Sequence, residues 1–210
     1  MEDRLIQERQ KIAGDHREVG YYEQAERWMG GFWDEGSPFP PLFDQLDLTT
    51  VIELACGHGR HAEHILHRAG NITLVDVNET NIAACRQRFA GKERVQFVVN
   101  KGNDLPGIAD ASQTALFCYD AMVHFELIDV LAYLRETKRV LVPGGRALLH
   151  VSNNMENPEG TYNQNRHWRN FGSLVVARHF AVRVGLRVLA HEVIDWSGEP
   201  ALDGMLLVEA

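Results

Sequence analysis

Short apolar segments alternate with amphipathic segments through the central part of the chain. The apolar segments, each five or six residues long, predict strands at 51–55, 72–77, 95–99, 114–119 and 147–151. Between them, apolar residues that recur every three or four positions predict helices at 60–69, 81–89 and 127–141. Strands that alternate with helices in this way are typical of βαβ units, in which a parallel sheet has helices on both faces.

The pattern changes after residue 151. Residues 152–170 are rich in Asn with Pro and Gly, and they predict a long loop of the kind that is usually functional or mobile. A helix is predicted at 174–184, followed by extended segments at 186–195 and 202–209 that the residues SGEP join. This hairpin-like ending predicts an antiparallel strand at the edge of the sheet.

Composition excludes several classes of protein. The length of 210 residues fits one large domain, and the net charge of −8 supplies no basic face for a nucleic acid. The first ten residues, MEDRLIQERQ, lack the features of a secretion signal, and no apolar segment is long enough to span a membrane. Three widely spaced cysteines favour reduced thiols over a disulfide framework. We expect a cytoplasmic protein without nucleic-acid or membrane partners. The sequence does not indicate an oligomeric state.

The stretch VIELACGHGRH at 51–61 ends the first predicted strand in a glycine turn. Gly57 and Gly59 let a ligand approach the backbone closely, and ligands of open α/β sheets bind at such strand ends. Gly57 to Ala62 formally matches the dinucleotide pattern G-x-G-x-x-G/A, and Asp76 follows at the expected distance. However, the Glu53 carboxylate would repel a pyrophosphate, whereas it would attract the cationic methionine end of S-adenosylmethionine.

Five segments together resemble the motifs of the class I, Rossmann-like S-adenosylmethionine-dependent methyltransferases. In chain order they are VIELACGHGR, LVDVN, VQFVVNKGNDLP, FCYDAMVHF and RVLVPGGRALLHV, which cover roughly residues 50–151. The fourth segment lacks the Asn-Pro-Pro-Tyr or Asp-Pro-Pro-Tyr of enzymes that methylate nucleic-acid amines, so the small-molecule branch is favoured. The resemblance implies an α/β fold with a doubly wound, mostly parallel seven-stranded sheet and an antiparallel edge strand.

The resemblance also implies which residues bind S-adenosylmethionine. The methionine end would contact Glu53, Ala55, Gly57 and Gly59, and the ribose would contact Asp76 and Val77. The adenine would contact Lys101, Gly102 and Asn103. From the fourth strand, the cofactor would be covered by Tyr119 and Asp120. Ala55 replaces the first glycine of the usual turn, which is acceptable if its φ is negative. Lys101 replaces a common acidic residue, so the adenine contact would fall to the backbone, Asn100, Asn103 or Asp104.

Methyl transfer to a hydroxyl requires a base near the reacting sulfur, so we look for one at the end of the fourth strand. His124 follows Asp120 by about one helical turn and could pair with it, and histidine titrates in a suitable range. His124 could equally be a buried residue that caps the next helix. His150 at a strand end and His167 in the long loop are further catalytic candidates.

Four histidines, His58, His61, His64 and His67, recur every three residues and suggest a metal site. On a helix, successive steps of three drift around the axis, and no Cys or carboxylate completes a set of ligands. We therefore interpret these histidines as a solvent-exposed helix face and expect no metal.

Aromatic residues are concentrated in the acidic N-terminal segment, at Tyr21, Tyr22, Trp28, Phe32 and Trp33. They could line a substrate cleft, or they could simply pin this segment to the sheet. By resemblance we expect residues 1–50 to form a helical lid or cap, residues 51–210 to form the methyltransferase domain, and the 152–170 loop to complete the substrate side.

The sequence thus predicts methyl transfer from S-adenosylmethionine to a small molecule, with a sugar or glycan hydroxyl favoured by resemblance alone. An NAD(P)-dependent oxidoreductase is the alternative enzyme, disfavoured by Glu53 and by the lack of a Tyr-x-x-x-Lys motif. A non-catalytic S-adenosylmethionine-binding protein is the third hypothesis, because one fold can serve many functions.

Overall fold

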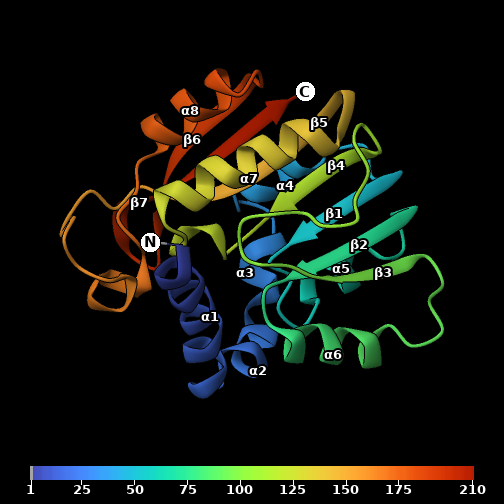
Figure 1. The fold of residues 1–210 in the computed structure, drawn as a ribbon, viewed down its shortest axis with the longest axis horizontal. Helices are drawn as coiled ribbons and strands as arrows, with labels where there is room; N and C mark the ends of the chain where they lie inside the picture. Colours follow the sequence, from blue (N-terminus) through green and yellow to red (C-terminus); the bar gives the residue numbers. More distant parts are fainter. Residues whose placement is uncertain (1) are drawn as a thin grey trace.

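A computed structural model describes residues 2–210, which form a seven-stranded sheet flanked by helices (Figure 1). The strand order is β3-β2-β1-β4-β5-β7-β6. The strands are β1 (Thr50–Leu54), β2 (Asn71–Asp76), β3 (Val95–Val99), β4 (Gln113–Cys118), β5 (Leu141–Ser152), β6 (Arg187–Trp196) and β7 (Glu199–Glu209). β1 to β5 are parallel, and β7 is antiparallel to both β5 and β6.

Most helices lie where the sequence pattern predicts them. The helices that follow the first strand are α5 (Arg60–Ile65), α6 (Glu79–Arg88), α7 (Leu127–Val140) and α8 (Leu174–Arg183), with short 3-10 turns η2 (Met122–His124), η3 (Tyr162–Gln164) and η4 (Arg166–Trp168). No helix in the described part of the chain is long and apolar enough to cross a membrane. The predicted α/β fold with a doubly wound, mostly parallel sheet is confirmed.

The predicted antiparallel pairing at the edge is confirmed, since the edge strand β6 pairs antiparallel with β7. One detail differs from the prediction. β5 begins directly after α7, whereas we predicted that Pro143-Gly144-Gly145 would separate helix from strand. Gln113 pairs with Leu141 but Ala115 pairs with Arg146, so residues 142–145 form an irregularity inside the strand instead of a separate loop.

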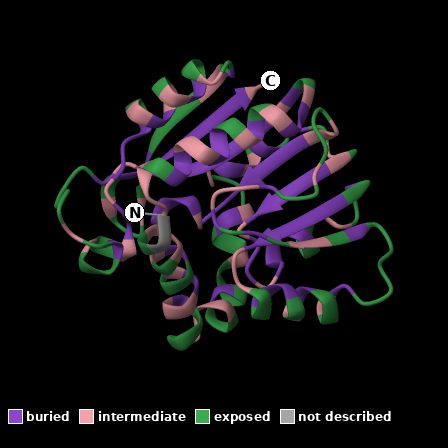
Figure 2. Ribbon diagram, viewed as in Figure 1, coloured by how far each residue is buried: buried purple, intermediate pink, exposed green. Residues whose placement is uncertain are grey.

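Alternating side chains along the strands build two apolar cores, one on each face of the sheet. Val51 and Phe117 pack with residues of α5 and α6, whereas Ile52 and Leu116 pack with residues of α7 and α8. The inner strands β1, β2, β4, β5 and β7 are therefore largely buried, whereas the edge strands β3 and β6 are more exposed (Figure 2). Such burial on both faces explains the continuous apolar segments in the sequence.

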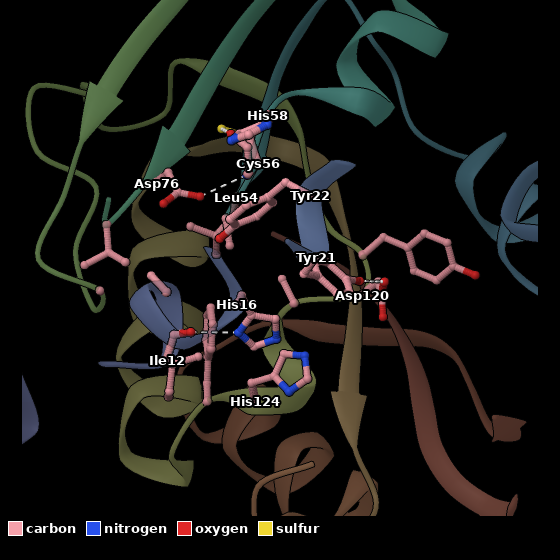
Figure 3. Close-up of a pocket in the computed structure, with 18 of the residues that line it drawn as sticks. Ile12, His16, Tyr21, Tyr22, Leu54, Cys56, His58, Asp76, Asp120 and His124 are labelled. Atoms are coloured by element: carbon pink, nitrogen blue, oxygen red, sulfur yellow. Dashed lines mark hydrogen bonds between the residues drawn. The ribbon is translucent and has the colours of Figure 1, made fainter. Parts of the chain in front are cut away.

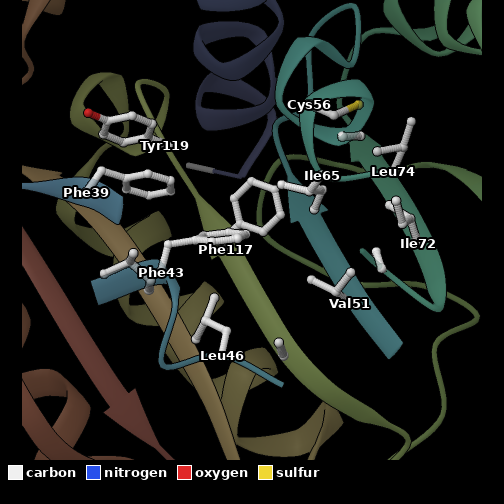
Figure 4. Packing of buried hydrophobic residues seen from close by; sticks show 14 of the residues in the cluster. Phe39, Phe43, Leu46, Val51, Cys56, Ile65, Ile72, Leu74, Phe117 and Tyr119 are labelled. Atoms are coloured by element: carbon white, nitrogen blue, oxygen red, sulfur yellow. The ribbon is translucent and has the colours of Figure 1, made fainter. Parts of the chain in front are cut away.

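The N-terminal segment is helical, with α1 (Glu2–Glu18), α2 (Tyr21–Ala25), η1 (Glu26–Trp28), α3 (Met29–Trp33) and α4 (Phe39–Phe43). Phe39 and Phe43 are fully buried in the core, where Phe39 stacks on Tyr119 with ring centroids 3.7 Å apart (Figure 4). α1 lies near the carboxyl ends of β1 and β2 (Figure 1). Arg9 fixes it there through a buried, two-pronged ion pair with Asp129, at 2.5 and 3.0 Å.

Candidate functional site

An inner pocket lies between the N-terminal helices and the carboxyl ends of β1, β2 and β4 (Figure 3). It encloses about 100 Å³ of open space. The predicted cofactor residues that line it are Ala55, Gly57, Asp76, Val77, Gly102, Tyr119 and Asp120. This is the place where open α/β sheets bind their ligands.

Asp76 is held rigidly at the edge of the inner pocket, at the last position of β2. Its carboxylate accepts hydrogen bonds from the backbone N–H groups of Gly57 (2.9 Å) and Asn78 (2.8 Å) and from the side chain of Asn81 (3.1 Å). Burial raises the pKa of Asp76 to about 6, although these donors oppose the shift. Asp76 is therefore ionised at neutral pH and able to accept hydrogen bonds from a ligand.

The two glycines of the turn have different surroundings. Gly57 (φ 53°) faces the inner pocket, and a Cβ there would lie 2.8 Å from the Tyr22 ring. Gly59 (φ 77°) begins α5, and a Cβ there would lie 2.7 Å from Phe89 in the core. We expected both glycines to admit a ligand, but the geometry gives Gly59 a packing role. Ala55 has φ +55°, so the condition of a negative φ is not met and this alanine adopts the left-handed conformation.

Glu53 lies behind the inner pocket, on the strand face that α5 covers. Its carboxyl group accepts a hydrogen bond from the Ala62 backbone, and its Oε2 has no partner among the described residues. Burial raises the pKa of Glu53 to about 8, so the group is mostly protonated at neutral pH. The expected direct contact with a methionine ammonium is absent from this geometry, and the argument that Glu53 repels a pyrophosphate loses its basis.

The residues after β3 divide between the inner pocket and the surface. Asn100 and Gly102 line the pocket, and a Cβ on Gly102 would lie 2.7 Å from the Arg9 side chain. Lys101 is exposed, and Asn103 lines a separate shallow groove together with Asp129. Of the predicted adenine residues, the structure therefore brings Gly102 to the pocket but not Lys101 or Asn103.

Asp120 stands at the end of β4 in a network of buried charges. Its Oδ2 accepts hydrogen bonds from Arg60 (2.8 Å) and from the Tyr21 hydroxyl, and its Oδ1 lies 3.9 Å from Arg169. Its φ of +55° is unusual for a residue other than glycine. The predicted pairing of Asp120 with His124 is absent, because two arginines and a tyrosine hold this carboxylate instead.

His150 holds the backbone of Asp120 through a hydrogen bond and does not line the inner pocket. Its Nδ1 accepts a hydrogen bond from the Asp120 backbone N–H (3.1 Å), so Nε2 carries the proton that binds Asp203 (3.0 Å). Burial opposes ionisation of Asp203, but the hydrogen bonds from His150 and Arg169 lower its pKa to about 2. Both ring nitrogens of His150 are therefore engaged, and the candidate base is better described as a positioning residue for Asp120.

A larger, outer cleft of about 660 Å³ adjoins the inner pocket. Its walls come from the N-terminal segment, from η4 and from the end of β6, and aromatic rings predominate: Tyr21, Trp28, Phe32, Tyr119, Trp168 and Trp196. The aromatic residues of the N-terminal segment are thus divided, since Tyr21, Trp28 and Phe32 line this cleft and Trp33 packs on Phe39 and Phe43 in the core. His167 is exposed at the rim of this cleft.

Five residues line both cavities and so mark the boundary between them: His16, Tyr21, Tyr119, Asp120 and His124. The sequence analysis selected Tyr119, Asp120 and His124, but it missed His16 in the N-terminal helix. It also missed Arg60 and Arg169, whose guanidinium groups surround Asp120. Arg60 directly follows the glycine turn, which is a signal that could have been used, whereas Arg169 lies in the irregular 152–170 segment.

The prediction of a solvent-exposed face holds for His64 and His67 but not for His61. His61 is buried, accepts a hydrogen bond from the Trp33 indole (3.1 Å) and leaves its Nε2 without a partner among the described residues. His58 stacks on Tyr22, and His64 stacks on Trp33. Among the described residues, no group of three or more His, Cys, Asp or Glu side chains could hold a metal ion.

The chain is similar in sequence and in fold to known methyltransferases. Residues 51–145 match the family model described as "Methyltransferase domain". The chain is 27% identical over 158 residues to ubiquinone biosynthesis O-methyltransferase of Pseudomonas aeruginosa. The aligned region covers 66% of this chain and 64% of that protein. It is 34% identical over 105 residues to a probable phthiotriol/phenolphthiotriol dimycocerosates methyltransferase of Mycobacterium ulcerans, covering 48% and 39%.

A solved structure, an S-adenosylmethionine-dependent methyltransferase from Mesorhizobium loti, superposes with a TM-score of 0.67 at 15% identity, covering 82% of this chain and 97% of that one. The residues of the inner pocket fit S-adenosylmethionine, since the Asp76 Oδ2 accepts a hydrogen bond from Gly57 and can accept another, and Ala55, Gly57 and Gly102 bring small residues to the pocket wall. Residues 51–145 are therefore similar to the methyltransferase domain family, and the chain has the fold seen in a solved S-adenosylmethionine-dependent methyltransferase.

Proposed function

We propose that this protein transfers a methyl group from S-adenosylmethionine to a small-molecule acceptor, with the cofactor in the inner pocket and the acceptor in the outer cleft. The observation that carries this proposal is the shared boundary. Five residues line both cavities, so the two ligands would be separated by no more than one layer of side chains. Holding two reactants in adjoining cavities supplies the orientation that such a transfer requires.

The residues of the inner pocket divide among the parts of the cofactor. Asp76 and Val77 hold the ribose, because Asp76 accepts hydrogen bonds and lies at the end of β2. Ala55 and Gly57 hold the methionine end, Asn100 and Gly102 lie along the adenine, and Tyr119 covers the cofactor from β4. Glu53, Gly59, Lys101 and Asn103 lie outside this pocket and act indirectly, by holding the turn and the loop after β3.

The bound cofactor supplies an electrophilic methyl group, and the protein must remove a proton from a hydroxyl acceptor. Asp120 is poorly suited, because Arg60, Tyr21 and Arg169 surround its oxygens. His124 is better suited, because it lies at the boundary of the two cavities and burial lowers its pKa well below the usual range, so the ring is neutral. His167 contacts only the rim of the outer cleft.

The acceptor is proposed to be a hydroxyl on a ring. Aromatic walls such as Trp28 and Trp196 stack on planar rings and on the apolar faces of sugars alike. The sequence analysis favoured a sugar or glycan hydroxyl, whereas the relative named as an O-methyltransferase acts in ubiquinone biosynthesis. We therefore keep a sugar hydroxyl and a phenolic hydroxyl as the two forms of the proposal.

A product assay separates these forms and tests the function itself. The protein is incubated with S-adenosylmethionine and either catechol or methyl glucoside, and mass spectrometry follows S-adenosylhomocysteine and the methylated acceptor. We expect both products to appear in equal amounts with one acceptor, and the variant Asp76→Ala to lose this turnover. Tight binding of added S-adenosylhomocysteine would still be possible without turnover. If it binds but no S-adenosylmethionine is converted and no methylated product forms with any hydroxyl compound, the non-catalytic binding protein becomes the better hypothesis.

A further inference from the structure

His16 lies in the last turn of α1, far in sequence from every motif of the methyltransferase domain. Its side chain is buried and lines both the inner pocket and the outer cleft. Figure 3 shows its ring beside that of His124, and the two ring centroids are 4.6 Å apart with the planes tilted by 58°. The N-terminal helix thus brings a second imidazole to the boundary of the two cavities.

The hydrogen bonds of the two rings fix their tautomers. The Nδ1 of His16 lies 2.7 Å from the Ile12 carbonyl oxygen, and the Nδ1 of His124 lies 2.6 Å from the Trp168 carbonyl oxygen. A carbonyl oxygen can only accept, so each Nδ1 carries the proton and each Nε2 of the neutral ring keeps a lone pair. Two proton-accepting nitrogens are therefore present where an acceptor hydroxyl meets the cofactor pocket.

Burial disfavours a charge on both rings and lowers the pKa of each. Arg169 also disfavours a charge on both, and His16 disfavours one on His124, whereas Asp120 and Asp15 favour a charge on His16, and Asp203 favours one on His124. The rings of Tyr21 and Trp168 pack edge-on against His16. Rings this close repel each other strongly when both are charged, so they titrate as a unit.

We propose that His16 and His124 form a paired proton-accepting site, and that docking of α1 completes it. This inference rests on the proposed function. The acceptor O–H bond breaks as a new N–H bond forms at Nε2 of one ring, while the second ring stays neutral. The electron pair of the O–H bond stays on oxygen, which bonds to the methyl carbon while the electrons of the old carbon–sulfur bond remain on sulfur. The proton later leaves to solvent through the open outer cleft.

Nuclear magnetic resonance of the histidine ring nitrogens tests the pair without an acceptor. The experiment uses ¹⁵N-histidine-labelled protein saturated with S-adenosylhomocysteine, titrated from high to low pH. Asparagine retains a donor at the position of Nδ1 but removes Nε2, so the variants are His16→Asn and His124→Asn. His191→Asn, on the exposed face of β6, is the matched control.

We expect both rings to show the Nδ1–H tautomer and to take up one proton together. His16→Asn should raise the midpoint of His124 by about one pH unit, because the variant removes the neighbouring ring that disfavours a charge on His124. His191→Asn should leave the midpoint unchanged. An Nε2–H tautomer in either ring, or a midpoint for His124 that stays constant in His16→Asn, would overturn the pair. Failure of S-adenosylhomocysteine to bind would instead overturn the proposed function, and the titration of the free protein would still decide the pair.

Discussion

Glu53 and Asp76 are two acidic residues near the ends of neighbouring parallel strands, and the structure uses them differently. Both are buried, and burial raises the pKa of both. Asp76 faces the inner pocket with backbone donors around it, whereas Glu53 faces α5 with one oxygen unpartnered among the described residues. Both side chains lie on the same face of the sheet, because Glu53 pairs with Leu74, two positions before Asp76. The position along the strand therefore decides which carboxylate reaches the pocket.

The largest expected difference between these two residues is in cofactor affinity. Asp76→Ala should weaken S-adenosylhomocysteine binding by about 100-fold or more, since it removes two charge-assisted hydrogen bonds. Glu53→Gln should change the affinity by less than about threefold, because Glu53 does not contact the pocket. Isothermal titration calorimetry measures both, with Asp44→Ala on the surface as the control. Equal losses in the two acidic variants would remove the distinction.

Of these two residues, Glu53 should contribute more to the pH dependence of the free energy of unfolding, because its pKa is raised further than that of Asp76. The unfolded chain releases this proton near the usual glutamate pKa of 4.5, but the folded protein retains it up to about 8. The free energy of unfolding therefore falls as the pH rises through this range, by at most about 1.4 kcal/mol per pH unit. Asp76 adds the same sign over a narrower range, from 3.8 to about 6.

Glu53→Gln mimics the protonated side chain and should abolish most of that loss. We expect the variant to gain about 2–3 kcal/mol over the wild type between pH 5 and pH 8, as followed by urea unfolding. A constant difference between the two proteins across this range would mean that Glu53 is ionised in the folded state.

Within the glycine turn, Gly59→Ala should destabilise the fold by about 2 kcal/mol. The new Cβ would overlap Phe89, and the alanine would have to keep the left-handed backbone conformation of Gly59. Because Gly59 packs against the core, the affinity of the folded variant for S-adenosylhomocysteine should stay within about threefold. A large loss of affinity at unchanged melting temperature would return Gly59 to the ligand side.

The smallest expected effect is at Ala55, whose φ of +55° is strained for a residue with a Cβ. Ala55→Gly should relieve that strain and raise the stability by up to about 1 kcal/mol, less the greater entropy that glycine gives the unfolded chain. Differential scanning calorimetry measures the change. A lower melting temperature would show that the methyl group packs more favourably than the strain costs.

Local patterns in the sequence predicted much of this molecule. Strand and helix periods located the sheet, and the position of Asp76 after the second strand placed it in the pocket, because both depend on neighbouring residues. The partners of Asp120 could not be predicted in the same way. Arg60, Arg169 and Tyr21 reach it from three separate segments, and only the folded chain brings them together.

The histidines show the same limit. His124 was selected because it follows Asp120, yet its neighbour in space is His16, 108 positions away. The series from His58 to His67 has a regular spacing, but its members contact the aromatic N-terminal segment individually. Spacing along a chain indicates a shared face only where one helix continues, and α5 ends at Ile65.

The central claim is that the inner pocket binds S-adenosylmethionine, and calorimetric titration of the wild-type protein tests it most directly. S-adenosylhomocysteine, NAD and NADP are titrated in parallel at neutral pH. We predict micromolar binding of S-adenosylhomocysteine and no measurable heat from either nicotinamide cofactor. Binding of NAD or NADP without S-adenosylhomocysteine would contradict the account and identify the glycine turn as a dinucleotide site.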